Sequence, residues 1–521
     1  MAAPSHHASS LWPRSHHRRC TPSLRSYAVG PQRKFEPRSA RTRQVPGELP
    51  HTPMASFTQK TNPYKHLSGR ETTLLTHLQP ATPSIAASDA FYAVPYRSGG
   101  GGPVYIGRLD QTSKVEPAEA LSNCVQGHKA EVKAVAFSPF HSALLATGGE
   151  DCRVRIAANV EDPSKESLEV GAHGSGVRCL QFHPAAEHVL LSASNDGSWA
   201  TWDVASELNR AASIHTGKLD AAVTHVDWNR STFAASCRDR TLRCVDVRTG
   251  AVAWSSVPHG GARAFRAVFA SRIEHCVLSV GSATSGGREV SLIDVRKPDA
   301  VVARAVIDAQ SGDVLSHWDE DSGLLWCVGR GDRVMRRFEC TSSAITQGAT
   351  WRSEQAACTS FCALPHKLRD VMDLEVFKCL RLTTSTVDTA SFRVVRTEDH
   401  KAFFNDDIFG ETRSRFPSTT AKRWAAGECP PSLTESCQPL GTKLLSERVV
   451  ERKVLNTVVV NERRASEKED RAKDDAAIDR LAQLADQFAN ANVNLSMGGN
   501  GVDAQVQDTG DVESDEWDDS D

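Results

Sequence analysis

The sequence predicts an all-β protein, a seven-bladed β-propeller, and two observations support this prediction. First, short runs of alternating apolar residues are separated by tight turns, as in residues 172–204, which indicates small antiparallel sheets. Second, the landmarks of these segments recur at a nearly fixed period, which is typical of four-stranded blades. His128, His173, His215 and His259 are 45, 42 and 44 residues apart.

Seven strand-rich segments can be counted along the chain, and the first is one strand short. We expect the chain before Phe91 to close the ring at the last segment, because closure removes exposed sheet edges. The seven segments are 91–109, 125–157, 172–204, 215–247, 259–295, 312–339 and 359–395.

The third segment carries the four residues of a WD-repeat tetrad, His173, Ser192, Asp196 and Trp202. We expect Asp196 to accept a hydrogen bond from the imidazole, while the Ser192 hydroxyl bridges to the ring and the indole N–H finds a buried partner. The role of this tetrad is structural, since it ties the strands to a turn. Asp151 and Asp239 follow their histidines at similar spacing, whereas the tryptophan occurs in one segment only.

Composition narrows the class of protein. The 521 residues are 40% hydrophobic and 24% charged, and the net charge is −3. The 14 cysteines show no paired spacing, so we expect reduced thiols rather than disulfides or a metal site. No run approaches the ~18 apolar residues of a membrane span, and no signal-peptide core follows the first methionine.

Motifs of catalysis are absent from the sequence, so we expect neither an enzyme nor a bound cofactor. It contains no Gly-x-Ser-x-Gly, no Walker loop and no His-Glu-x-x-His. The glycines at 99–102 are followed by Pro103 rather than by the Lys-Ser/Thr of a phosphate-binding loop. Arg330-Gly331-Asp332 is interpreted as a hairpin turn.

The N-terminal residues 1–53 differ from the rest, with nine Lys and Arg, two acidic residues and no aliphatic periodicity. Such a stretch cannot bury a core and is expected to be disordered. It is interpreted first as an extension ahead of a domain that starts at Met54. An organelle transit peptide and a basic arm that touches nucleic acid or membrane are the alternatives.

Beyond the predicted propeller at 54–395, four C-terminal regions are expected. Residues 396–440 mix aromatics with Pro and Gly and are expected to pack on the propeller, and 441–464 are expected to form a linker. Ser466 and Glu469 indicate a capping box for a short amphipathic helix at 465–491. Its apolar face comprises Ile478, Leu481, Leu484, Ala485 and Phe488, and a disordered acidic tail follows at 492–521.

Several segments resemble the coronins, a family of actin-binding WD-repeat proteins. The resembling segments are 64–66, 235–248, 266–269, 328–339, 377–382, 391–396 and 404–409. The resemblance implies a propeller that binds actin filaments, with a short extension after it. The trimerising coiled coil of short coronins is absent, so a monomer or weak self-association is expected.

The C-terminal Asp515, Glu516, Trp517, Asp518 and Asp519 resemble the acidic tail of the long, tandem-propeller coronins and of nucleation-promoting factors. The resemblance implies contact with the branched-actin nucleating complex of actin-related proteins. An unfolded acidic tail attracts a basic surface over long range, and one indole can anchor in a pocket. A merely solubilising tail is the alternative.

We therefore expect a cytoplasmic protein of the actin cytoskeleton that binds filaments and no nucleic acid. Lys65 and Arg70 are the candidate filament contacts. Two other functions remain open. A substrate receptor of a ubiquitin ligase is one, because Asp246-Val-Arg248 and Asp294-Val-Arg296 stand where such receptors carry a Trp-Asp-x-Arg box, although Val245 and Ile293 replace the tryptophan. A Golgi or vesicle trafficking scaffold is the other.

Overall fold

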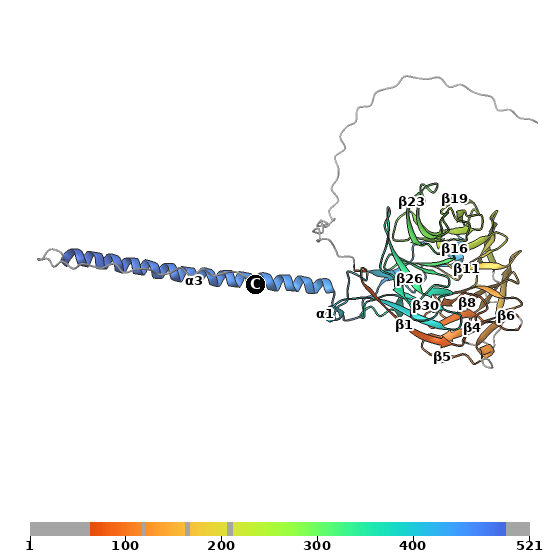
Figure 1. The fold of residues 1–521 in the computed structure, drawn as a ribbon, viewed down its shortest axis with the longest axis horizontal. Coiled ribbons are helices and arrows are strands. Elements are labelled where there is room, and N and C mark those ends of the chain that lie inside the picture. The colour runs from red at the N-terminus through yellow and green to blue at the C-terminus, as the bar shows by residue number, and fades with distance from the viewer. Residues whose placement is uncertain (1–62, 100, 117–119, 162–166, 206–211, 496–521) are drawn as a thin grey trace, which may run out of the picture. The chain divides into compact units, whose positions relative to one another are not determined.

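The computed structural model describes residues 63–99, 101–116, 120–161, 167–205 and 212–495 (Figure 1). The expected disorder of residues 1–53 and the acidic residues Asp515 to Asp519 lie outside the described residues. Residues 1–60 and 61–521 form separate units, and the account below concerns the second.

Seven small antiparallel sheets, numbered here as blades 1 to 7 and given from the innermost strand outwards, make up the propeller. Blade 1 contains β2 (Ala86–Ala87), β3 (Phe91–Pro95), β4 (Gly102–Arg108) and β6 (Cys124–His128). Blade 2 contains β7 (Val132–Phe137), β8 (Leu145–Gly149), β9 (Arg153–Ala157) and β10 (Leu168–Ala172). Blade 3 contains β11 (Val177–Phe182), β13 (Val189–Ser194), β14 (Ser198–Asp203) and β15 (Ala212–Lys218). Blade 4 contains β16 (Val223–Asn229), β17 (Thr232–Cys237), β18 (Leu242–Asp246) and β19 (Val252–Ser256).

The remaining blades complete the ring. Blade 5 contains β20 (Arg266–Phe269), β21 (Cys276–Ser282), β22 (Arg288–Asp294) and β23 (Val301–Asp308). Blade 6 contains β24 (Val314–Asp319), β25 (Leu324–Gly329), β26 (Val334–Cys340) and β27 (Ile345–Gln347), with β28 (Trp351–Arg352) also paired to β26. Blade 7 contains β29 (Ser360–Ala363), β30 (Glu375–Leu382), β31 (Val387–Val394), β1 (Leu67–Thr76) and β5 (Ser113–Lys114). Two short 3-10 helices, η1 (Ala120–Asn123) and η2 (His366–Leu368), lie in its connections.

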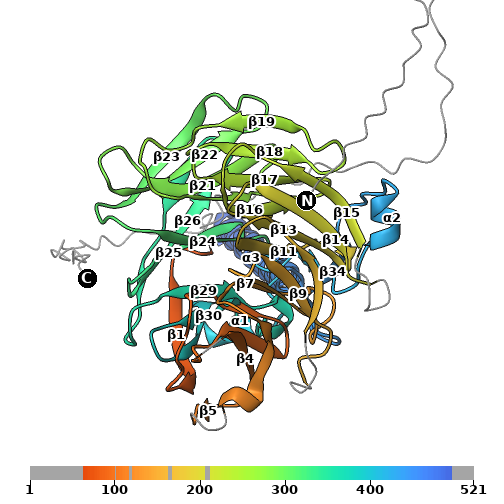
Figure 2. The same ribbon diagram turned by 90° about the vertical axis from the view of Figure 1, so that its right-hand side faces the viewer.

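The inner strands form a closed cycle around the centre of the molecule (Figure 2). Each inner strand contacts the inner strand of the next blade, from β2 through β7, β11, β16, β20 and β24 to β29, which contacts β2 again. Apolar side chains fill the space between neighbouring blades, as in the cluster that joins Trp199 and Phe233 of blades 3 and 4. The predicted seven-bladed β-propeller is confirmed.

The ring is closed by the N-terminal strand. β1 pairs antiparallel with β31 from Leu67–Val394 to Leu75–Val387, as expected for the chain before Phe91. The Glu71 carboxylate holds this strand to the blade 6–blade 7 connection, because it accepts hydrogen bonds from Arg381 Nη1 at 2.9 Å and from Ser353 Oγ at 2.7 Å. Arg381 is buried and Glu71 is nearly so, with side-chain exposures of 2% and 11%.

One turn recurs in several blades just before the second strand. His188, His275 and Leu374 each have a φ of about +60° and precede β13, β21 and β30. Each also accepts, through its backbone carbonyl, a hydrogen bond from the amide at the end of the third strand. The left-handed conformation of these residues is therefore a property of the repeat.

The C-terminal extension, residues 396–440, contacts blades 3, 4, 6 and 7. Its elements are α1 (Glu398–Lys401), β32 (Glu411–Arg413), β33 (Thr419–Thr420), α2 (Ala421–Ala425) and β34 (Thr434–Ser436). β33 pairs in parallel with β12 (Ala186–Glu187) beside blade 3. Trp424 is 2% exposed and its ring lies 5.8 Å from that of Trp228 in blade 4. Apolar burial of this kind is what holds an irregular segment on a folded domain.

Helix α3 (Leu445–Leu495) has 51 residues, so it is about 76 Å long. The linker predicted at 441–464 is therefore wrong from Leu445 onwards, and Ser466 caps no helix. Its hydroxyl instead donates to the carbonyl of Arg463 at 2.8 Å within the helix. The start of the helix is fixed by a distant residue, because Asp406 Oδ1 accepts from the Ser446 amide at 3.1 Å.

Ile478, Leu481 and Leu484 of the predicted apolar face are all exposed on α3. The side chain of Phe488 lies outside the described residues. Within the part of the chain that the structure describes, no helix combines the length and the apolar character that a membrane crossing requires.

We expect Arg381→Met to lower the free energy of unfolding by about 3–5 kcal/mol, because it leaves the buried Glu71 carboxylate without its counter-ion. Urea denaturation followed by tryptophan fluorescence measures this loss. Arg108→Met is the matched control, since Arg108 pairs with Asp110 at the surface with side-chain exposures of 48% and 62%. The control is expected to change stability by less than about 1 kcal/mol. An equal effect of both substitutions would contradict the closing role of Glu71 and Arg381.

We also expect stability to fall as the pH drops from about 6.5 to 4. Burial lowers the pKa of His183 to about 4, and its neutral Nδ1 accepts hydrogen bonds from the amides of Ala185 and Ala186 at 3.0 and 2.8 Å. The unfolded chain binds a proton in this range that the folded chain does not, so His183 contributes on the order of 3 kcal/mol that is lost progressively on acidification. Urea unfolding across this range should show a shallower pH slope for His183→Asn, which keeps an acceptor but does not titrate. An unchanged slope would assign the acid sensitivity to other groups.

Candidate functional site

The four tetrad residues of blade 3 meet in the structure. Ser192 Oγ lies 2.7 Å from His173 Nε2 and accepts a hydrogen bond from Trp202 Nε1 at 2.8 Å. The direct bond expected between His173 and Asp196 is not formed. Ser198 stands between them, 2.7 Å from His173 Nδ1, and donates to Asp196 Oδ1 at 2.6 Å. The sequence could not indicate this relay because Ser198 lies outside the usual tetrad positions.

In other blades the corresponding histidine has different hydrogen-bond partners. His128 binds Asp151 directly at 3.0 Å and Thr147 at 2.9 Å. His259 binds Glu289 of β22 and Ser279, each at 2.9 Å, so a strand residue replaces the turn aspartate. Burial lowers the pKa of both imidazoles below the usual value, although each carboxylate opposes the shift. Their neutral, internally bonded rings are suited to holding turns together.

The prediction that His215 is the repeat histidine partnered by Asp239 is wrong. This residue lies inside β15, and its ring centroid is 6.0 Å from that of Trp424 in the extension. Asp239 is bound by Arg243 instead, at 3.1 Å from Nη1, and also by Thr241 Oγ1 at 2.6 Å. Burial raises the pKa of Asp239, but these hydrogen bonds outweigh burial and lower the pKa to about 2. A local arginine thus replaces the imidazole in blade 4.

Lys65 and Arg70 are the candidate filament contacts. Lys65 lies just before the outer strand β1 of blade 7, Arg70 lies within that strand, and both are exposed. Arg70 is paired with Ser391 of β31, which is paired in turn with Lys378 of β30. The three residues therefore share one row on one face of blade 7. Among the described residues no carboxylate forms an ion pair with Lys65 or Arg70.

The backbone beneath these two cations is firmly held. The Arg337 guanidinium donates to the carbonyls of Tyr64 and Lys65. On the other face of β1, a Cβ added at Gly69 would overlap the Trp351 ring, so glycine allows close packing against blade 6. Together with Glu71, these contacts turn the N-terminal strand into a rigid support for exposed positive charge.

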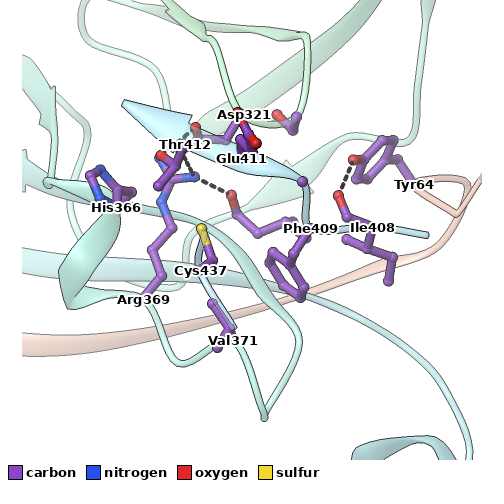
Figure 3. A pocket seen from close by; sticks show the side chains of 13 residues that line it. Tyr64, Asp321, His366, Arg369, Val371, Ile408, Phe409, Glu411, Thr412 and Cys437 are labelled. Carbon is purple, nitrogen blue, oxygen red and sulfur yellow. Dashed lines mark hydrogen bonds and ion pairs between the residues drawn. The ribbon is translucent and has the colours of Figure 1, made fainter. Parts of the chain in front are cut away.

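A narrow cleft separates the extension from blades 6 and 7 (Figure 3). Its cavity volume of about 20 Å³ holds about one water molecule, so it is a docking seam rather than a ligand pocket. Asp321 joins the two sides, because it accepts from Thr412 Oγ1 at 2.7 Å and from Arg369 Nη1 at 3.1 Å. Tyr64 donates to the carbonyl of Ile408 at 3.5 Å, and burial raises the pKa of Tyr64 to about 12.

The arginines of the two Asp-x-Arg sequences are both exposed but have different partners. Arg248 donates to the carbonyl of Gly427 at 2.6 Å and contacts the Cys429 thiol at 2.9 Å, so the extension occupies it. Arg296 is 65% exposed and bonds to Asp294 on its own turn. No local pattern indicates the contact of Arg248, because Gly427 of the extension lies 179 residues further along the chain.

These features define the chain as a WD-repeat β-propeller with a docked C-terminal extension. The family model described as "WD domain, G-beta repeat" matches residues 120–156 and 164–203. The chain belongs to the coronin family of WD40-propeller proteins.

Several relatives support the assignment. Coronin-2A of Homo sapiens is 26% identical over 394 residues, which cover 71% of this chain and 72% of that protein. Coronin-A of Dictyostelium discoideum is 28% identical over 355 residues, covering 66% and 76%. The crystal structure of the WD40 domain from Toxoplasma gondii coronin superposes with a TM-score of 0.65 and 25% identity, and covers 72% of this chain and 98% of that one. Coronin-7 of Rattus norvegicus is 30% identical, but the match spans 32% of its length.

Proposed function

We propose that the propeller binds actin filaments and that the protein regulates actin dynamics in the cytoplasm, at the actin cytoskeleton. Coronin-family membership over most of the chain carries this proposal, because the family is one of actin-binding proteins. Tyr64 and Ile408 lie in two of the segments that resemble the family, and they contact each other across the seam. The part of the chain shared with the family is thus one continuous structural unit of propeller and extension.

Lys65 and Arg70 are the proposed filament contacts. Filament surfaces are acidic according to the family resemblance, and both side chains are exposed, Arg70 on β1 and Lys65 just before it. The Glu71–Arg381 pair already orders the backbone here, so binding costs less backbone entropy than it would in a flexible loop.

We expect the double variant Lys65→Ala/Arg70→Ala to weaken co-sedimentation with actin filaments by about tenfold, since each exposed ion pair contributes up to ~1 kcal/mol. Filament binding by the native protein should also weaken with added salt. The matched control is Arg263→Ala/Lys297→Ala, which removes two exposed cations near blade 5 that have no ion pair within the described residues. Unchanged pelleting of the first variant would remove these two residues from the proposal. Failure of the native protein to pellet at low ionic strength would overturn the actin proposal itself.

The acidic tail is proposed to engage the branched-actin nucleating complex through Asp515, Glu516, Trp517, Asp518 and Asp519. Helix α3 is proposed to act as a spacer between the extension and this tail. All its described side chains between residues 458 and 487 are exposed, which suits a solvated helix. Its short apolar stripe is compatible with a monomer or with weak self-association.

We expect Trp517→Ala to reduce binding of the nucleating complex by at least tenfold, as is usual for an indole anchor at an interface. Pull-down with purified complex measures this loss. Filament co-sedimentation of the same variant should be unchanged, so the two activities can be separated. If the variant and the native protein bind the complex equally, the tail serves solubility only.

A substrate receptor of a ubiquitin ligase remains the second candidate function, on the basis of Asp294-Val-Arg296. The contacts of Arg248 with the extension disfavour this candidate, since the arginine of one of its two boxes is already bonded within the chain. A pull-down that recovers a cullin adaptor without actin would favour this candidate. A Golgi or vesicle trafficking scaffold is a third candidate, prompted by the partial match to Coronin-7.

A further inference from the structure

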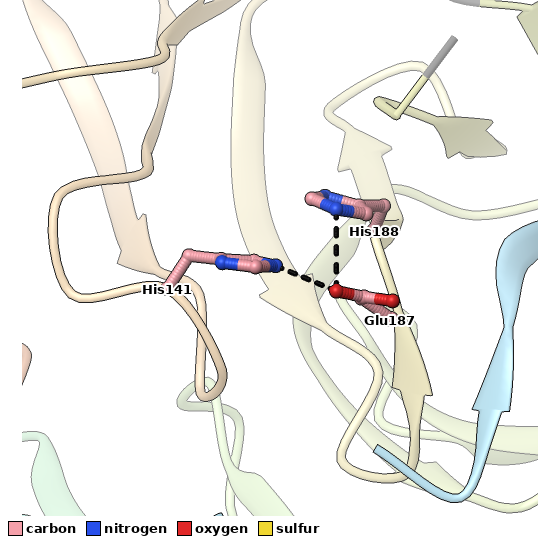
Figure 4. Close-up of side chains that lie close together, drawn as sticks. All are labelled: His141, Glu187 and His188. Carbon is pink, nitrogen blue, oxygen red and sulfur yellow. Dashed lines mark hydrogen bonds and ion pairs between the residues drawn. The ribbon is translucent and has the colours of Figure 1, made fainter. Parts of the chain in front are cut away.

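Three potential metal ligands meet where blades 2 and 3 adjoin (Figure 4). His141 comes from the turn between β7 and β8, and Glu187 and His188 come from the turn before β13. His141 Nε2 lies 2.8 Å from Glu187 Oε1, and His188 Nε2 lies 3.5 Å from the same oxygen. The two imidazoles are stacked, with centroids 4.5 Å apart and planes inclined by 11°.

The backbone at all three residues is fixed before any ligand binds. Ser138 Oγ accepts hydrogen bonds from the amides of Phe140 and His141 at 3.3 Å, which sets the first turn. The pairing of β12 with β33 holds the backbone of Glu187, and the carbonyl of His188 accepts from Val204 at 3.0 Å. Such preorganisation lowers the free energy cost of assembling a metal site.

The imidazole of His188 has an unsatisfied polar atom. Its Nδ1 is buried and has no hydrogen-bond partner among the described residues, and its Nε2 makes only the 3.5 Å approach to Glu187. An imidazole nitrogen without a hydrogen-bond partner can offer its lone pair to a metal ion.

We propose that His141, Glu187 and His188 bind one Zn²⁺ ion. Two imidazoles and a carboxylate form a donor set that zinc accepts with one position left open. Mg²⁺ and Ca²⁺ prefer all-oxygen sites, and the absence of a thiolate from these three residues disfavours Cu(I). The site is independent of the proposed binding of actin.

The spacing of the donor atoms fits zinc, whereas the stacked His188 ring must rotate for its lone pair to point at the ion. Zinc bonds of ~2.0–2.1 Å in a tetrahedral site place ligand atoms about 3.4 Å apart. The three donor atoms already lie within 4.8 Å of one another, and the two nitrogen–oxygen distances bracket the required spacing. A rotation of the His188 ring about its side-chain bonds would turn Nε2 towards the ion.

A second Glu-His turn in the same chain offers a comparison with the cluster of His141, Glu187 and His188. Glu274 and His275 occupy the equivalent turn before β21, and His275 has the same left-handed conformation as His188, with φ of 59° against 60°. The neighbouring turn in blade 4 carries Arg230 where blade 2 supplies His141. Among the described residues only the first of these two turns gathers three ligands.

The open position of the ion would face a cleft beside the turn. His141 and His188 line this cleft together with Phe91, Phe140 and Glu161, and its volume is about 690 Å³. Water can therefore reach the ion and supply the fourth ligand. Because Glu187 is paired with Thr420 of the extension, the bound ion would also link blade 2 to the turn on which the extension packs.

The full-length protein, kept reduced and freed of metal with a chelator, should take up one Zn²⁺ per chain at this site in a titration against a chromophoric zinc indicator. Co²⁺ in place of Zn²⁺ should give the visible absorption of a four- or five-coordinate ion with nitrogen and oxygen ligands. Mg²⁺ should not compete.

The double variant His141→Ala/His188→Ala should lose more than the ~10–100-fold in affinity that loss of an outer partner costs a metal site. Glu274→Ala/His275→Ala is the matched control, since it changes the equivalent turn and should leave zinc affinity and the cobalt spectrum unchanged. Far-ultraviolet circular dichroism of both variants monitors folding. Equal zinc affinity of the ligand variant and the native protein, or a sulfur-to-cobalt charge-transfer band that indicates cysteine ligands, would overturn the proposal.

Discussion

The propeller depends on one constraint, that the first strand of the chain must close a ring whose other strands come from residues up to Val394. β1 provides this closure, and the buried pair of Glu71 with Arg381 determines where it lies. A buried carboxylate tolerates no misplacement, because each of its oxygens would lose a charged or backbone donor. Glu71 also accepts from the amides of Glu354 and Gln355 at 3.0 Å, so the pair fixes the position of β1 relative to blade 6 as well as within blade 7. The exposed face of β1 gains its rigidity from this buried side.

Each blade needs a polar link between a turn and a strand, but the chain supplies that link with different residues. Blade 2 uses an imidazole and an aspartate, blade 3 adds Ser198 as a relay, and blade 4 uses Arg243 with Asp239. In blade 6, Asp332 is bound by Arg288 from β22 of blade 5. Such variety is possible because apolar packing between neighbouring blades fixes each strand independently of the polar link. The backbone geometry is therefore more constant from blade to blade than the side chains that link turn and strand.

This difference explains how much the sequence could predict. The number of blades, the closing strand and the meeting of His173, Ser192 and Trp202 follow from periodicity and spacing, which the backbone repeat preserves. Glu289 and Arg243 could not be predicted, because each substitutes for an expected residue at a different position along its strand. The early start of α3 was missed for another reason. Asp406, which accepts from the first-turn amide of Ser446, is distant in sequence, and a local search for capping residues finds only Ser466. The exposure of Lys65 and Arg70 agrees with the candidate surface, whereas their role in binding stays a prediction.

The extension links the regions of the molecule that sequence analysis treats separately. It contacts Tyr64 near the closing strand, bonds to Arg248 beside blade 4, and pairs with Glu187 next to His141 and His188. Its side chains Trp424 and Ile408 are 2% and 7% exposed, the first packed against blades 3 and 4 and the second against blade 7. Removal of the extension would therefore expose apolar surface on several blades at once, which makes the extension part of the folded domain rather than a separate unit.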